Sequence, residues 1–377
     1  MNEDKATRYH RLKRQAAVLS LVWSVAVLGA LLSSEWTLKL RSAAESVAVR
    51  LGAPAAWLPS VSVPIYVLFL LLINETGSLP TALYSGFALE RRYGLSNERF
   101  GSWLLDQAKA LAIGLALGGA GASVVYWQIR LLPDRWWLTS GLIFALLIVV
   151  LANLAPVLLL PVFYRLKPLE RDSLRVRLLG LADRAGARVL GAYEWGLADK
   201  TKKANAALAG LGSTRRILVS DTMLAEYSDE EIEVVLAHEL AHHVHGDIWK
   251  GIVFESALIL AGFYVAARLL VAFAGTFGLR GVDDVAGLPV LLLAAGTVSL
   301  VMVPFAHAVS RAYERSADRF ALSLTRNPGA FISAMRRLAV QNLAEDRPSR
   351  LVKWLFYSHP PIRERIADAE AILNGDG

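Results

Sequence analysis

The segment His238-Glu239-Leu240-Ala241-His242 has the residue types and the spacing of a zinc peptidase site. On an α-helix, side chains four positions apart lie on one face, about one turn from each other. The two imidazoles can therefore bind one zinc ion, with Glu239 beside the open coordination position as a general base. Because the chain has only 7 histidines in 377 residues, we interpret the motif as a metal site and not as a chance pair.

The residues before the motif predict the helix that the two histidines need. Ser228 and Glu231 have capping-box spacing, and the acidic residues between them suit the positive end of the helix dipole. The helix begins with charged residues, and Asp247 follows the motif. We therefore expect the zinc helix to begin in water, unlike intramembrane proteases whose zinc helix is itself a hydrophobic span.

A catalytic zinc site needs a third protein ligand, and the sequence offers several candidates. His243 and His245 follow the motif, but three histidines on one straight helix cannot all converge on one ion. Glu255 lies about two turns into an apolar segment, which makes ligation together with His242 awkward. Glu314, in the segment that follows the last apolar run, is the candidate that we favour.

Glu314 and Asp318 are again four residues apart, so a helix would present both carboxylates on one face. One can bind zinc while the other accepts the N–H of a ligating imidazole and fixes its tautomer. The alternative is a charged helix at the membrane surface in which Arg311, Glu314 and Asp318 serve only solvation. We predict one zinc ion per chain, with three ligands and an orienting residue: His238, His242, Glu314 and Asp318.

The composition excludes several other classes of site. The chain has no cysteine, which rules out disulfides, cysteine nucleophiles and thiolate-bound metals. Charged residues make up 19% of the chain, below the roughly 25% of a typical soluble domain. The net charge of +7 fits basic cytoplasmic loops, and no basic stripe with interleaved aromatics indicates nucleic-acid binding. We expect a predominantly α-helical, polytopic membrane protein that contacts the lipid bilayer and binds no nucleic acid.

Apolar runs of about 20 residues predict about six transmembrane helices. These runs cover residues 15–33, 61–79, 110–127, 137–163, 248–274 and 287–306. The first run follows basic residues, as in a signal peptide, but it lacks a convincing cleavage site and we interpret it as an uncleaved span. A seventh, weaker span at residues 47–59 is the alternative. It contains two prolines, and an odd count would move one end of the chain to the wrong side.

The basic residues predict the orientation and the division of the chain. An N-terminus in the cytoplasm also puts Arg91, Arg92 and Arg99 inside, leaving weakly basic loops outside. We expect residues 1–164 to form a membrane region of four spans with a cytoplasmic connector, and residues 165–247 to form a cytoplasmic catalytic insert. Residues 248–309 would form two further spans, and residues 310–377 a cytoplasmic segment that completes the site.

The insert has mixed secondary-structure signals. Residues 174–187 have helical spacing, residues 188–193 and 216–220 are strand-like, and residues 204–211 form a segment of small residues. The insert is therefore a small α+β zinc-metalloprotease unit between membrane spans.

Several further blocks of sequence occur in a fixed order around the zinc motif. They include Leu79-Pro80, Tyr93-Gly94-Leu95-Ser96, Lys203-Ala204-Asn205-Ala206, Asp221-Thr222-Met223-Leu224 and Ser358-His359-Pro360-Pro361. With the zinc motif and Glu314, these blocks resemble the CAAX prenyl protease type 1 family over nearly the whole chain. That family comprises integral-membrane zinc metalloendopeptidases of the gluzincin type.

The resemblance implies roles for three further residues. Asn205 would lie on an edge strand that pairs with the substrate backbone, and His359 and Arg365 would hold the substrate or its developing oxyanion. Without the resemblance, His359 would be an ordinary turn residue and Arg365 an ordinary helix charge. The resemblance also implies seven spans around a large intramembrane chamber, one more than the apolar runs give.

Three functions are compatible with the sequence. The resemblance implies an endopeptidase that acts on C-terminal, including lipid-modified, peptides from the cytoplasmic side, at the inner membrane in a bacterium. The same chemistry would also serve a quality-control protease that cleaves misfolded membrane proteins. A non-catalytic scaffold with a structural zinc is disfavoured, because a structural zinc has no need of the general base Glu239.

Overall fold

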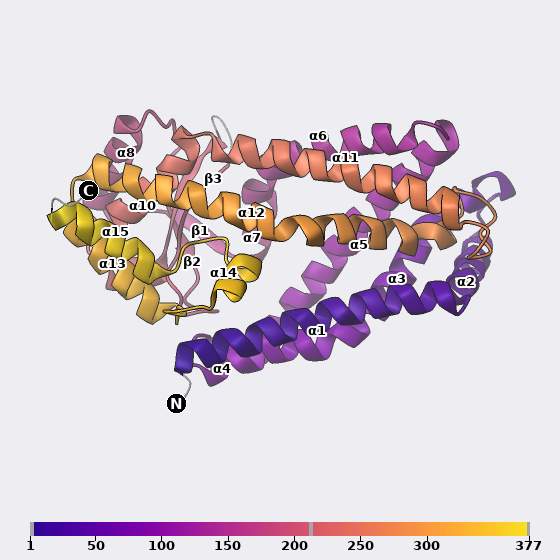
Figure 1. Ribbon diagram of the computed structural model, residues 1–377, viewed down its shortest axis with the longest axis horizontal. Coiled ribbons are helices and arrows are strands. Elements are labelled where there is room, and N and C mark those ends of the chain that lie inside the picture. The colour runs from indigo at the N-terminus through magenta and orange to yellow at the C-terminus, as the bar shows by residue number, and fades with distance from the viewer. Residues whose placement is uncertain (1–3, 211–213, 375–377) are drawn as a thin grey trace.

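The computed structural model describes residues 4–210 and 214–374, and it consists of a bundle of long helices with an α+β unit at one end (Figure 1). Within these described residues, six helices are long and apolar enough to cross a membrane, which confirms the number predicted from the apolar runs. They are α1 (Lys5–Ser33), α3 (Leu58–Ala82), α5 (Phe100–Leu131), α6 (Trp136–Leu158), α11 (Asp247–Phe273) and α12 (Leu288–Thr325).

The alternative span at residues 47–59 does not form one helix. These residues contain the end of α2 (Trp36–Arg50), a short 3-10 turn (Ala55–Trp57) and the start of α3. Helix α2 lies at the end of the bundle opposite the α+β unit and packs against α3 (Figure 1). With 15 residues it is about 22 Å long, too short for a hydrocarbon core of about 30 Å.

Two boundaries differ from the sequence prediction. The run at residues 137–163 is divided, because α6 ends at Leu158 and a separate short helix, α7 (Leu160–Phe163), follows with a proline in its first turn. Helix α3 continues through a π-helical segment (Leu83–Ala88) into α4 (Leu89–Arg92), so most of the expected connector is helical. The sixth span and the segment that carries Glu314 are one continuous helix of 38 residues, α12.

The α+β unit is built on a four-stranded sheet with the order β1-β2-β4-β3. Its strands are β1 (Arg165–Pro168), β2 (Ala192–Gly196), β3 (Ala206–Ala209) and β4 (Arg216–Ser220). β1 pairs antiparallel with β2, β2 parallel with β4, and β3 antiparallel with β4. The sequence prediction located β4, placed β2 a few residues too early and missed β1. β3 lies at an edge of the sheet.

Five of the six helices of this unit share an apolar core with the sheet, and the sixth, α14 (Arg350–Phe356), packs against α12. The five are α8 (Asp172–Arg184), α9 (Asp221–Glu226), α10 (Asp229–Val244), α13 (Pro328–Gln341) and α15 (Ile362–Asn374). Their shared core is apolar and includes Leu174, Leu178, Leu181, Ile217, Leu236, Phe331 and Met335. Each such side chain contributes about 1.5–3 kcal/mol when it is fully buried. The zinc-motif helix α10 is thus fixed on a rigid unit.

A cavity of about 640 Å³ lies between the membrane helices. Residues from α1, α3, α5, α6, α11 and α12 line it, and most of them are apolar. Its polar lining residues include Asn74 and Glu255. Glu255, one of the alternative third ligands, therefore belongs to the membrane cavity and not to the cluster described next.

Candidate metal centre

The start of α10 has the predicted cap. Ser228 Oγ accepts a hydrogen bond from the backbone N–H of Glu231 at 3.2 Å, and the Ser228 N–H donates to Glu231 Oε2 at 2.8 Å. This confirms the capping box. The apolar face of the helix is buried, and it carries His238 into the interior while His242 remains half-buried.

His238, His242 and Glu314 meet in one cluster, with one ligand atom of each lying within 4.8 Å of the others. Glu314 Oε2 is 3.1 Å from His238 Nε2, and Glu314 Oε1 is 3.3 Å from His242 Nε2. Helix α10 supplies the two histidines, and α12, the helix that contains the sixth candidate span, supplies Glu314. The structure therefore brings together the three residues predicted as ligands.

Two carboxylates hold the other nitrogens of the imidazoles. Asp318 Oδ1 lies 2.8 Å from His238 Nδ1, and Asp247 Oδ2 lies 3.0 Å from His242 Nδ1. When each Nδ1–H donates to its carboxylate, the lone pair of Nε2 faces Glu314 and can bind a metal. The sequence analysis found Asp318 but missed Asp247. The signal for Asp247 was its position directly after Gly246, where the chain turns from α10 to α11.

The cluster fits a metal ion by its donor chemistry. Two neutral imidazoles and one carboxylate are a common ligand set for a catalytic zinc with an open fourth position. Although Glu314 Oε2 is buried and 3.1 Å from His238 Nε2, it accepts no hydrogen bond from the described residues as long as that nitrogen carries no proton. Such a buried, unsatisfied oxygen is costly unless it has another partner, which a cation would be.

The electrostatics of the α10 residues follow from burial and from the neighbouring carboxylates. Burial alone would lower the pKa of His238, but the Asp318 and Glu314 carboxylates, which would accept from both ring nitrogens of the protonated imidazole, raise this pKa to about 9. Burial raises the pKa of the Glu239 carboxyl, which the neighbouring histidines partly oppose. A raised pKa suits a carboxyl that must both accept and return a proton near neutral pH.

Arg365 reaches the cluster beside Asp318 and His238, and its Nη2 lies 3.2 Å from His238 Nδ1. Its Nε and Nη2 donate to the two Asp318 oxygens at 2.8 and 2.6 Å, and the side chain is buried. The guanidinium thus holds the carboxylate that orients His238. This geometry suits a positioning group for Asp318 and His238, and the contact of Arg365 with the substrate or its oxyanion, which the resemblance implies, stays a prediction.

His359 lies in the segment before α15 (Ile362–Asn374) and reaches the cluster from the open side. Its Nε2 is 3.2 Å from Glu314 Oε1, and its side chain is 61% exposed. Its Nδ1 lies 2.9 Å from Ser358 Oγ. An accessible imidazole beside the metal ligands is well placed to contact a bound substrate.

Asn205 directly precedes β3, and its backbone is bonded to β4. Its N–H donates to Ser220 Oγ at 3.0 Å, and its carbonyl accepts from the Ser220 N–H at 2.9 Å. The residue itself is exposed. Asn205 thus stands at the start of the edge strand against which α10 packs.

The two other histidines near the end of α10, His243 and His245, lie apart from the cluster. The imidazole of His245 packs edge-on against Phe320, with ring centroids 5.5 Å apart. His243 is half-buried, and burial lowers its pKa. Neither residue belongs to the group whose ligand atoms meet in the described residues.

Comparison with known proteins identifies the family. Residues 168–373 match peptidase family M48, and residues 2–165 match a family described as CAAX prenyl protease N-terminal, five membrane helices. Among the described residues of that N-terminal region, five helices have 15 residues or more: four candidate spans and the shorter α2.

Individual relatives extend over most of the chain. It is 33% identical over 309 residues to the uncharacterized metalloprotease YhfN of Bacillus subtilis, covering 81% of this chain and 72% of that protein. It is 26% identical over 310 residues to CAAX prenyl protease 1 of Saccharomyces cerevisiae, covering 76% of this chain and 67% of that protein.

The fold also has a solved counterpart, the crystal structure of S. mikatae Ste24p. The TM-score is 0.87 at 22% sequence identity, covering 97% of this chain and 88% of that chain. This likeness shows the polytopic helical fold with its small α+β insert. From the family match, the relatives and the metal-binding cluster together, we conclude that the chain belongs to peptidase family M48 and is a membrane metalloendopeptidase.

Proposed function

We propose that the enzyme is a zinc endopeptidase that cleaves peptide bonds in the C-terminal regions of its substrates, including lipid-modified ones. The observation that carries the proposal is the cluster of His238, His242 and Glu314 beside Glu239. Two Nε2 atoms and one carboxylate converge there, and each Nδ1 has its own carboxylate. A structural zinc would need neither the adjacent carboxylate nor an open side.

Bound zinc would polarise the scissile carbonyl and lower the pKa of a water molecule. Glu239 accepts the proton of the attacking water and returns it to the leaving amine. His359 donates a hydrogen bond to the oxyanion as charge develops there. Asp318, held by Arg365, keeps His238 in the tautomer that binds the metal, and Asn205 lies at the strand that receives the substrate backbone.

The position of the site supports a location at the membrane surface. His242 is followed within five residues by Asp247, the first residue of span α11, so the ligands lie at the junction of the soluble unit and the bundle. The basic residues Arg91, Arg92 and Arg99 favour the cytoplasmic side for this end of the bundle.

The membrane cavity supports lipid-modified substrates. A volume of about 640 Å³ with mainly apolar lining is within the range of small-molecule sites and suits an aliphatic chain. Its lining residue Glu255 lies eight residues after Asp247 on α11, about 12 Å along the helix. A chain held in the cavity would thus be attached to a peptide near the metal.

The test is cleavage of one C-terminal peptide sequence with and without a farnesyl group by the purified enzyme. We expect the farnesylated peptide to have the higher kcat/KM, mainly through a lower KM. Equal values would contradict the lipid preference and favour a broad-specificity quality-control protease. No cleavage of any peptide by the zinc-loaded wild type would contradict the endopeptidase itself.

A further inference from the structure

The segment that leads into β3 is tied to two distant parts of the chain by three hydrogen bonds. The Lys202 N–H donates to the Leu95 carbonyl at 2.9 Å, and the Asn97 N–H donates to the Lys200 carbonyl at 3.1 Å. Gln341 Nε2 donates to the Lys202 carbonyl at 2.9 Å. The start of the edge strand is therefore fixed by the connector before α5 and by the end of α13.

Successive residues of β3 direct their backbone N–H and C=O groups to opposite sides of the strand. One side faces β4, and the other is the free side of this edge strand. Asn205 bonds to Ser220 of β4, so the N–H and C=O groups of Ala204, Ala206 and Leu208 point away from β4. Ala206 and Leu208 have no backbone hydrogen bond on that side within the described part of the chain. These two residues are the groups that an added peptide strand would pair with.

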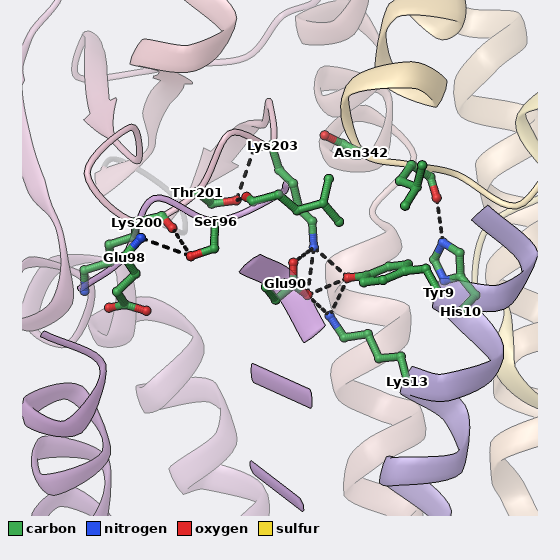
Figure 2. Close-up of polar contacts among 12 residues, drawn as sticks. Tyr9, His10, Lys13, Glu90, Ser96, Glu98, Lys200, Thr201, Lys203 and Asn342 are labelled. Atoms are coloured by element: carbon green, nitrogen blue, oxygen red, sulfur yellow. Dashed lines mark hydrogen bonds and ion pairs between the residues drawn. The ribbon is translucent and has the colours of Figure 1, made fainter. Parts of the chain in front are cut away.

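The backbone N–H and C=O of Ala204 are already hydrogen-bonded on the side that faces away from β4. An added peptide strand therefore cannot continue past Ala204. The Ala204 N–H donates to Asn342 Oδ1 at 3.0 Å, and Asn342 Nδ2 donates to the Ala204 carbonyl at 3.2 Å. The Asn342 amide thus occupies the place of the next residue of a pairing strand. The loop that carries Asn342 is fixed in turn, because His10 Nε2 lies 2.9 Å from the Leu343 carbonyl (Figure 2).

Beside this closed end lies a cluster with more positive than negative charge. The ammonium groups of Lys13 and Lys203 both contact Glu90, at 2.5 and 2.9 Å, and the Tyr9 hydroxyl donates to the same carboxylate at 2.5 Å (Figure 2). One carboxylate faces two ammonium groups, so a charge of +1 remains.

The two lysines remain accessible in this cluster. Their side chains are 43% and 28% exposed, whereas that of Glu90 is 11% exposed. Burial and the neighbouring Lys13 ammonium lower the pKa of Lys203. A second carboxylate at the exposed side would neutralise the cluster without displacing Glu90.

We propose that this end of β3 is a binding site for the C-terminal carboxylate of the substrate, with Asn342 closing the strand edge and Lys13 and Lys203 supplying the charge. A peptide strand paired with Ala206 and Leu208 must end at Ala204. Because the charge there is positive, the terminus that fits is the carboxylate and not the amine. The substrate then runs antiparallel to β3 and is cut close to its C-terminus. This inference rests on the proposed endopeptidase function and specifies its substrate terminus.

The experiment compares one peptide in three forms: with a free C-terminal carboxylate, with a C-terminal amide, and with one added C-terminal residue. We expect the wild type to favour the free acid over the amide by about tenfold in kcat/KM, and to disfavour the extended peptide. Lys13→Met should reduce the acid-to-amide ratio to near one, and Asn342→Ala should improve cleavage of the extended peptide.

Lys13→Met leaves the contacts of Lys203 and Tyr9 with Glu90 in place. Lys203→Met is the second variant and Lys203→Arg its conservative rescue. Arg336→Met removes an exposed ion pair with Glu370 and should leave all ratios unchanged, which makes it the matched control. A wild type that cleaves none of the peptides contradicts the endopeptidase. A wild type that cleaves acid and amide equally, or a Lys13→Met variant that retains the preference, overturns the carboxylate site alone.

Discussion

Asp247 Oδ2 lies 3.0 Å from His242 Nδ1, and this contact joins a residue of the metal cluster to the first residue of membrane helix α11. Gly246 makes the contact possible, because its φ of 68° turns the chain sharply between the two helices. Glu314 and Asp318 likewise lie on the membrane helix α12. The cluster is therefore assembled by the membrane helices as well as by the α+β unit.

Replacing Asp247 should weaken metal binding. Asp247→Asn keeps the shape but removes the charge that orients the His242 imidazole, and loss of such a partner typically costs about 10- to 100-fold in metal affinity. Competition with a chromogenic zinc chelator measures this loss. Glu255→Gln, on the same helix but in the membrane cavity, is the control and should bind zinc as the wild type does. Unchanged affinity in Asp247→Asn would contradict an orienting role.

Substitutions of Arg365 and of His359 should have different effects on zinc binding and on kcat. Arg365→Met leaves the buried Asp318 carboxylate without its guanidinium, so zinc affinity and activity should fall together. His359→Gln should retain zinc and lower kcat by about 100-fold, as expected for loss of one oxyanion donor. Zinc content and kcat are measured on the same samples. Full zinc occupancy with a reduced kcat in Arg365→Met would contradict the positioning role and support an oxyanion role for Arg365.

The affinity for zinc should rise with pH well above neutrality. The pKa of His238 is raised from 6.5 to about 9 in the metal-free protein, so this imidazole is protonated at pH 7.5 and must lose a proton to bind zinc. The same shift stabilises the metal-free fold below pH 6.5, and that stabilisation is lost as pH rises through about 9. Calorimetric titration in two buffers of different ionisation enthalpy measures the released protons. An affinity that stays constant between pH 6.5 and 9 would contradict this linkage.

The sequence was most informative where a local rule operates. The capping box, the helix that carries His238 and His242, and the number of long apolar runs each depend on neighbours within a few turns, and these appear in the described residues as predicted. β1 was missed because a four-residue strand ending in proline has no recognisable alternation. Its pairing with β2 is a tertiary property.

The residues around the metal cluster and the strand edge also show that sequence patterns predict local contacts better than contacts between distant residues. Asp318 could be found because it repeats the four-residue spacing of the histidines, and the structure brings it to His238. The contact of Arg365 with Asp318 and the contact of Asn342 with Ala204 join residues far apart in the chain, so no local pattern contains them. The resemblance pointed to Arg365 as a site residue but did not contain its contact with Asp318.

The central claim is that His238, His242 and Glu314 hold a catalytic zinc for which Glu239 is the base. Its most direct test is zinc content and peptide cleavage of the purified enzyme, compared between wild type, Glu239→Gln and Glu314→Ala. We expect Glu239→Gln to retain one zinc per chain and lose about 10²- to 10⁴-fold in rate, and Glu314→Ala to lose zinc and activity together. Full zinc content in Glu314→Ala, or wild-type activity in Glu239→Gln, would contradict the account.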